Sequence, residues 1–397
     1  MVKNIYLTRY SKILLPLIGL ILLMFAFNAW SNVKNWHDNE RYLTTDKELK
    51  ADFNAYPEHY TYLDEKKQEH IPYASFEKYI EHQLYVYHKN DFSDKISQKT
   101  DPNQTYFNQS SNVATVFVLF LASFVGFCLF FVDLKTHFTR FLFSLPVSRK
   151  ELFAKKLLYL ALPFLATIFV GQLLYLAILR LGIPQPYLNA SLGDMFASVV
   201  NSFSLIIVFF CLSVFVGVMV GNLVFGPLTW FVFLIFLCQI PSAVGGLLSM
   251  IRMLHAHFLR DFDFNTLFIF EIGKTTGHWY MSLLFLLISI SFIYWAYRKF
   301  QVISLEHESE YLLTPESRWQ IWFFMTVLTS FVLVFAIKNP WSYYLSGLQY
   351  NFEVSFMATM MTTLTIIVIC GGICFVVVFF SCIKHFFRSL KARRLAR

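Results

Sequence analysis

The sequence predicts an all-α, multi-pass membrane protein with about eight transmembrane helices and a small helical extracellular domain between the first two. Composition is the first reason: 56% of the 397 residues are hydrophobic, only 15% are charged, and Phe alone occupies 46 positions. A soluble fold of this size has too little interior to bury so much apolar surface. The same composition excludes nucleic-acid-binding, collagen-like and disordered proteins.

Eight apolar runs are the second reason. A helix needs about 20 predominantly apolar residues to cross the roughly 30 Å hydrocarbon core of a bilayer. Each run is therefore predicted to be one membrane span. The runs cover about residues 13–30, 113–132, 157–179, 199–220, 223–240, 279–297, 319–337 and 354–380.

The distribution of charge is the third reason, because it separates two aqueous compartments. Residues 31–112 carry ten Lys and Arg against fourteen Asp and Glu, although the whole chain has a net charge of +8. In the termini and short loops, eighteen Lys and Arg lie on the side of the N-terminus and five on the opposite side. By the positive-inside rule, both termini are predicted to be cytoplasmic, with residues 31–112 outside.

These patterns divide the chain into six segments. In the polar segment, a possible N-cap at Ser75 precedes residues that recur at helical spacing, which predicts a helix and a small aromatic core. The recurring residues are Phe76, Tyr79, Ile80, Gln83, Leu84 and Tyr87. The half-apolar stretch 241–258 is too short to span and predicts an outer re-entrant or interfacial segment. The segments are the N-terminus and first span (1–30), the extracellular helical domain (31–112), the membrane core (113–300), an acidic cytoplasmic linker (301–318), an additional pair of spans (319–380) and a basic cytoplasmic tail (381–397).

The sequence contains no pattern typical of a catalytic or metal site. The eight predicted spans hold no charged residue that could relay protons or ions. Residues 272–275 resemble the end of a phosphate-binding loop, but Phe268 stands where that loop requires glycine. His255 and His257 are two residues apart and would point to different faces of a helix. We therefore expect no catalytic residue, no metal and no cofactor in this chain.

The cytoplasmic connector 133–156, between the second and third spans, is the most informative segment. Apolar residues recur there at positions i, i+3, i+4 and i+7, which predicts a short amphipathic helix. Pro146 ends that helix, and a capping box of Ser148 and Glu151 starts the next one. These patterns alone fit a basic interfacial loop as well as a docking element. The apolar positions are Phe138, Phe141, Leu142 and Leu145.

Residues 143–157 resemble the signature of the ABC type-2 permease family, the membrane subunits of bacterial ABC exporters. The resemblance in layout extends over roughly residues 1–300, and the last two spans are an addition to the six that the family commonly has. The residues that match the signature are Leu145, Pro146, Ser148, Arg149 and Lys155.

The resemblance implies a partner and an energy source. The connector would be a coupling helix that docks on a cytoplasmic ABC ATPase subunit, which would bind the ATP and Mg. Phe138 to Leu145 would fill a groove of the ATPase, and Arg140 and Arg149 would supply charge pairs. A second permease chain, identical or different, would complete the assembly in the bacterial cell membrane, in contact with membrane lipid. Phe-rich spans suit a lipid, an amphipathic peptide or a hydrophobic antibiotic as substrate.

Two other functions use the same features. A membrane sensor or scaffold would bind a ligand through its extracellular domain and recruit a cytoplasmic partner. A membrane-embedded enzyme acting on lipids would need polar side chains that meet at one depth of the bilayer, and the sequence shows no such cluster.

The charge distribution makes a prediction about topology. Cysteines introduced at Glu69 and Ser346 should react with an impermeant thiol reagent added to intact cells, because both positions are predicted to be outside. Cysteines at Ser309 and Ser389 should react only after the cells are opened. Labelling of Ser309→Cys in intact cells would contradict the arrangement with eight spans.

Overall fold

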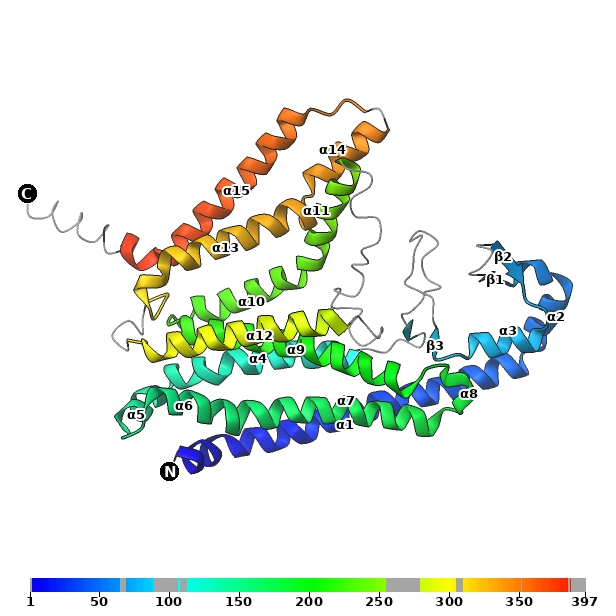
Figure 1. Ribbon diagram of the computed structural model, residues 1–397, viewed down its shortest axis with the longest axis horizontal. Coiled ribbons are helices and arrows are strands. Elements are labelled where there is room, and N and C mark those ends of the chain that lie inside the picture. Colours follow the sequence, from blue (N-terminus) through cyan, green and yellow to red (C-terminus); the bar gives the residue numbers. More distant parts are fainter. Residues whose placement is uncertain are drawn as a thin grey trace, which may run out of the picture.

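The chain folds into long helices that run side by side, with a smaller mixed segment at one end (Figure 1). The computed structural model describes residues 2–64, 69–88, 106–107, 113–254, 279–304, 310–350, 352–384 and 386. Within these residues, eight helical segments are long and apolar enough to cross a membrane, which confirms the predicted all-α, multi-pass class. They are Val2–Thr45, Val113–Lys135, Arg149–Gly182, Leu192–Met219, Phe225–Leu248, Trp279–Gln301, Pro315–Leu348 and Phe356–Val378.

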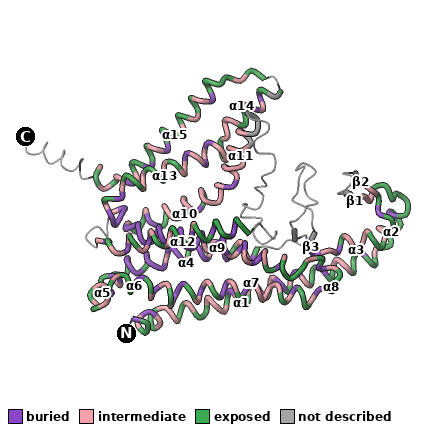
Figure 2. The backbone as a smooth tube through the Cα atoms, viewed as in Figure 1, coloured by how far each residue is buried: buried purple, intermediate pink, exposed green. Residues whose placement is uncertain are grey.

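Helix α9 (Leu192–Met219) forms the centre of the bundle. It packs along α4 (Val113–Lys135) and along α12 (Trp279–Gln301). Every residue of α9 from 208 to 219 is buried, and Figure 2 shows buried residues concentrated on α4 and α9. Side-chain packing rather than the exclusion of water stabilises such contacts in a membrane, because lipid tails are as apolar as the side chains.

Small residues let α4 and α9 approach closely. A Cβ atom on Gly217 would lie 2.4 Å from the carbonyl oxygen of Phe127, and one on Gly126 would lie 2.6 Å from the carbonyl oxygen of Phe210. The hydroxyls of Ser123 and Ser213 also form a hydrogen bond of 2.6 Å between these helices. Small residues and hydroxyl pairs of this kind are typical of membrane helix interfaces.

Helix α1 (Val2–Thr45) lies beside α7 (Leu162–Gly182) and extends beyond the bundle. Its 44 residues span about 66 Å, so the chain stays helical across the predicted boundary at residue 30. The extension is held by tertiary contacts, since the Trp36 indole N–H donates to the carbonyl oxygen of Leu84 at 2.8 Å. Helix α7 continues α6 (Arg149–Lys156) through one π-helical turn.

The segment predicted to be an extracellular helical domain is a mixture of helices and short strands. The predicted N-cap is confirmed, because the Ser75 hydroxyl accepts from the Lys78 N–H at the start of α3. The predicted helical repeat continues too far: α3 ends at Gln83, and Tyr87 lies in a strand because the chain turns to pack against Trp36. The elements are α2 (Lys47–Ala55), β1 (Thr61–Asp64), β2 (Glu69–Pro72), α3 (Phe76–Gln83), β3 (Tyr87–His88) and β4 (Tyr106–Phe107), with β1 paired to β2 and β3 to β4, both antiparallel.

The predicted aromatic core of this segment is present. The ring of Phe53 lies 5.1 Å from that of Tyr60 and 5.5 Å from that of Phe76, measured between centroids. Tyr79 packs edge-on against Tyr73 at 5.4 Å. Burial raises the pKa of Tyr73 to about 12, so its hydroxyl stays protonated at neutral pH.

The remaining helices form a second group above the bundle in Figure 1. Helix α13 pairs with α15, so the predicted additional spans make a hairpin. The described part of the predicted re-entrant segment is helical: α11 follows α10 after a bend and packs against α14 and the adjoining π-helical turn. Residues 255–258 of that prediction lie outside the described residues. The helices of this group are α10 (Phe225–Cys238), α11 (Ile240–Leu254), α13 (Arg318–Val332), α14 (Pro340–Gln349) and α15 (Phe356–Val378). The short α8 (Gln185–Leu188) lies apart from them, after the end of α7 (Figure 1).

The close approach of α4 and α9 makes a prediction about stability. Gly217→Ala should lower the free energy of unfolding by about 1–3 kcal/mol, because the new methyl group must displace the backbone of α4. Gly372→Ala is the matched control, since no atom lies within 4 Å of its added Cβ. Thermal unfolding of the purified chain in detergent measures both variants, and equal melting temperatures would contradict the close packing.

Candidate functional site

The connector predicted from the sequence lies at one end of the bundle. Helix α5 (Phe138–Ser144) and the start of α6 are beside the N-terminus, at the end opposite α2 and α3 (Figure 1). Helix α5 begins after His137, whose left-handed backbone (φ 57°) turns the chain out of α4. Pro146 separates α5 from α6, as predicted. The connector therefore consists of two short helices joined by a turn, each packed against the bundle.

The predicted capping box is half formed. The Ser148 hydroxyl accepts from the Glu151 N–H at 3.3 Å and starts α6. The Glu151 carboxylate forms an ion pair with Lys155 one turn further along instead of returning to the backbone of Ser148. Both partners of this pair are partly exposed, so the pair contributes little to stability.

The side chains of the predicted apolar stripe of α5 point in two directions, some into the bundle core and some outward. Leu142 is buried in the bundle core, and Phe138 and Leu145 pack against that core while staying partly exposed. Phe141 is 48% exposed and stacks on Phe138 with ring centroids 5.7 Å apart. Pro146 is also exposed. The structure therefore leaves Phe141 and Pro146 as the outward apolar surface of the connector.

The two predicted arginines are placed differently. The side chain of Arg140 lies on the exposed side of α5. Arg149 is instead used within the chain: its guanidinium donates to the carbonyl oxygens of Gln301 and Ile303, both at 2.9 Å. It also lies 4.3 Å above the ring of Phe143, a cation–π contact. Arg149 thus joins α6 to the end of α12.

A buried ion pair joins the two ends of the connector, which we call its base. This pair was not predicted from the sequence. Asp133, in the last turn of α4, pairs with Lys156, the last residue of α6. Their side chains are only 1% and 3% exposed. The sequence shows an acid and a base at the two ends of the connector, but only the antiparallel packing of α4 and α6 brings them together. The pair holds the two ends of the connector side by side.

Helix α1 completes this cluster. The Tyr10 hydroxyl donates to Asp133, and the Arg9 guanidinium lies 3.5 Å from the same carboxylate. Arg9 also donates to the Thr136 hydroxyl at 2.7 Å, and its guanidinium lies 4.1 Å above the ring of Phe138. Buried charges are stable only when their remaining hydrogen-bonding positions are satisfied. The residues of α1 meet that requirement, so the cluster fixes the connector to both α1 and α4.

Other sequence candidates carry no site in the described part of the chain. Within it, no three His, Cys, Asp or Glu side chains are close enough to hold a metal ion. His255, His257 and residues 268–275 lie outside the described residues.

Comparison with known proteins finds no matching family model, no similar curated protein and no similar solved structure. The resemblance of residues 143–157 to the ABC type-2 permease signature therefore stays a prediction from the sequence.

The contacts of Arg149 make a prediction about the connector. Arg149→Met should lower the free energy of unfolding by about 1.5–3 kcal/mol, because two carbonyl groups lose a charged donor. Hydrogen exchange of residues 299–304 should accelerate at the same time. Lys150→Met, at the neighbouring exposed position, is the control and should change neither quantity. Unaltered exchange in Arg149→Met would show that the arginine does not anchor α6.

Proposed function

We propose that this chain is the transmembrane permease subunit of an ATP-driven ABC exporter and that α5 and α6 dock on its ATPase. The observation that carries the proposal is the position of Phe141. It presents a half-exposed aromatic ring at the tip of a connector whose base is fixed by buried charges. Aromatic residues in a helix are typical anchors for a partner's groove.

The attachment of the connector suits the transmission of force. A coupling element must move the membrane helices when its partner moves, so it has to be rigid with respect to them. The cluster at Asp133 joins the connector to α1 and α4, and Arg149 joins it to α12. A displacement of α5 would therefore move three helices, of which α4 and α12 both pack on the central α9.

The proposed assembly follows from this docking surface. The ATPase partner would bind ATP and Mg, and this chain would supply no catalytic residue. A second permease chain, identical or different, would complete the membrane part. The bias of Lys and Arg toward the side of the N-terminus supports a cytoplasmic position for the connector and for both termini in a bacterial cell membrane. The apolar, Phe-rich spans favour a lipid, an amphipathic peptide or a hydrophobic antibiotic as substrate.

The docking proposal is tested at Phe141. Phe141→Asp should weaken binding of the ATPase by about a hundredfold or more, because an unpaired charge buried in a contact costs several kcal/mol. Val224→Asp is the matched control: Val224 is 71% exposed in the turn between α9 and α10, outside the connector. Co-purification of the ATPase, normalised to the amount of permease in the membrane, measures the effect.

The outcomes separate the permease from the sensor or scaffold. Selective loss of the ATPase in Phe141→Asp supports the permease. Equal recovery with wild-type, Phe141→Asp and Val224→Asp chains would contradict a coupling role for α5 and would favour the sensor or scaffold.

A further inference from the structure

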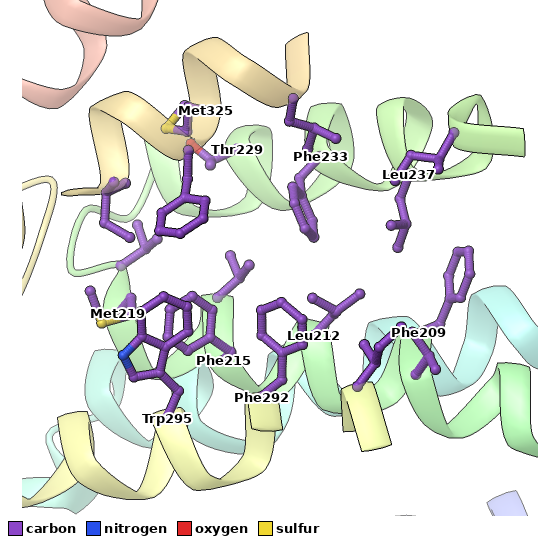
Figure 3. Close-up of a pocket in the computed structure, with 18 of the residues that line it drawn as sticks. Phe209, Leu212, Phe215, Met219, Thr229, Phe233, Leu237, Phe292, Trp295 and Met325 are labelled. Carbon is purple, nitrogen blue, oxygen red and sulfur yellow. The ribbon is translucent and has the colours of Figure 1, made fainter. Parts of the chain in front are cut away.

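An apolar cavity of about 420 Å³ lies between the bundle and the second group of helices. Helices α9 and α12 form one wall, and α10 and α13 form the other (Figure 3). Its volume lies within the range of about 300–1,000 Å³ that is typical of ligand pockets. Side chains that face it include Phe209, Leu212, Phe215, Phe233, Leu237 and Phe292.

The chemistry of the lining excludes water and polar ligands. The Tyr311 hydroxyl and the Thr229 hydroxyl are hydrogen-bonded to each other at 3.1 Å, and Tyr311 also donates to the sulfur of Met325 at 3.6 Å. Water needs two to four polar partners to occupy a cavity, and the almost wholly hydrocarbon walls do not supply them.

The cavity is elongated along the helices. Its lining on α9 includes both Phe209 and Met219, ten residues and therefore about 15 Å apart along the axis. Figure 3 shows these two residues near opposite ends of the cavity. A narrow apolar slot parallel to the membrane-spanning helices matches a hydrocarbon chain better than a compact molecule.

The charges and surfaces around the slot match a phospholipid. Trp295 lines the end nearest the connector, and Lys299 follows one turn later on α12, on the same face of the helix. The Lys299 ammonium donates to the Ser317 hydroxyl at 2.6 Å, and an ammonium group has two further donors for an anion. The outward side chains of Phe231 on α10 and Leu287 on α12 are more than half exposed, which places the slot beside lipid.

We propose that the slot holds one acyl chain of a membrane phospholipid whose phosphate group binds Lys299. The lipid would fill the space between the two groups of helices and join them. This inference does not depend on the proposed function, because it requires only that the helices cross a bilayer.

Native mass spectrometry of the detergent-purified chain tests retention of the lipid. The wild-type chain should retain one phospholipid, and Leu237→Trp, which fills the slot, should weaken its binding by about tenfold, equivalent to roughly 1.4 kcal/mol, and so lower the retained fraction. Ile235→Trp is the matched control, because Ile235 is exposed on the same helix and does not line the slot. Equal retention in all three chains, or retention of a molecule other than a phospholipid, would overturn the proposal.

A second measurement uses photolabelling, and its main result comes from the wild-type chain, where no substitution can affect folding. Phosphatidylglycerol with a diazirine near the end of one acyl chain is incorporated with the protein into vesicles of phosphatidylglycerol and phosphatidylethanolamine and then irradiated. Labelled peptides should include Leu212 and Leu237, and Lys299→Gln should lower that labelling. Labelling confined to outward residues such as Phe231 and Leu287 would overturn the proposal.

Discussion

The ion pair between Asp133 and Lys156 is the interaction on which the rest of the arrangement depends. Each charge would be costly in a site where both side chains are almost completely buried, so each requires the other together with hydrogen bonds from α1. This requirement fixes the end of α4 beside the end of α6 and holds α1 against both. The connector of α5 and α6 therefore has a rigid base, and its outward ring at Phe141 has a defined position relative to the long helices.

The same base connects to the centre of the molecule. Helix α4 carries Asp133 near one end and packs closely on α9 at Gly126 and Gly217. Arg149 joins α6 to the end of α12, which also packs on α9. The segment after α12 also packs against α9, since Gly221 N–H donates to the carbonyl oxygen of Tyr311 at 2.9 Å. The second group of helices approaches this centre less closely and leaves the apolar slot. The chain therefore consists of a closely packed bundle and a second group of helices with the slot between them.

Much of the fold could be predicted from the sequence, because long apolar segments have few stable alternatives. Backbone groups in a bilayer must be paired within the segment, so each apolar run had to be a helix. Local chemistry also identified Ser75 and Ser148 as N-caps. The inward use of Arg149 and the pairing of Asp133 with Lys156 were not predictable, since both depend on which helices become neighbours. For the same reason the predicted linker 301–318 contains Tyr311 and Leu312, which pack against the end of α9 instead of remaining solvated.

A double-mutant cycle on Asp133→Asn and Lys156→Met tests the central role of the ion pair most directly. The free energy of unfolding and the hydrogen exchange of residues 138–156 are measured for the wild-type chain, both single variants and the double variant. Each single variant should lose about 3–5 kcal/mol, and the double variant should lose less than the sum of the two by about 1–3 kcal/mol. Exchange in the connector should accelerate in each single variant. Small, additive losses with unchanged exchange in residues 138–156 would show that the pair does not anchor the connector.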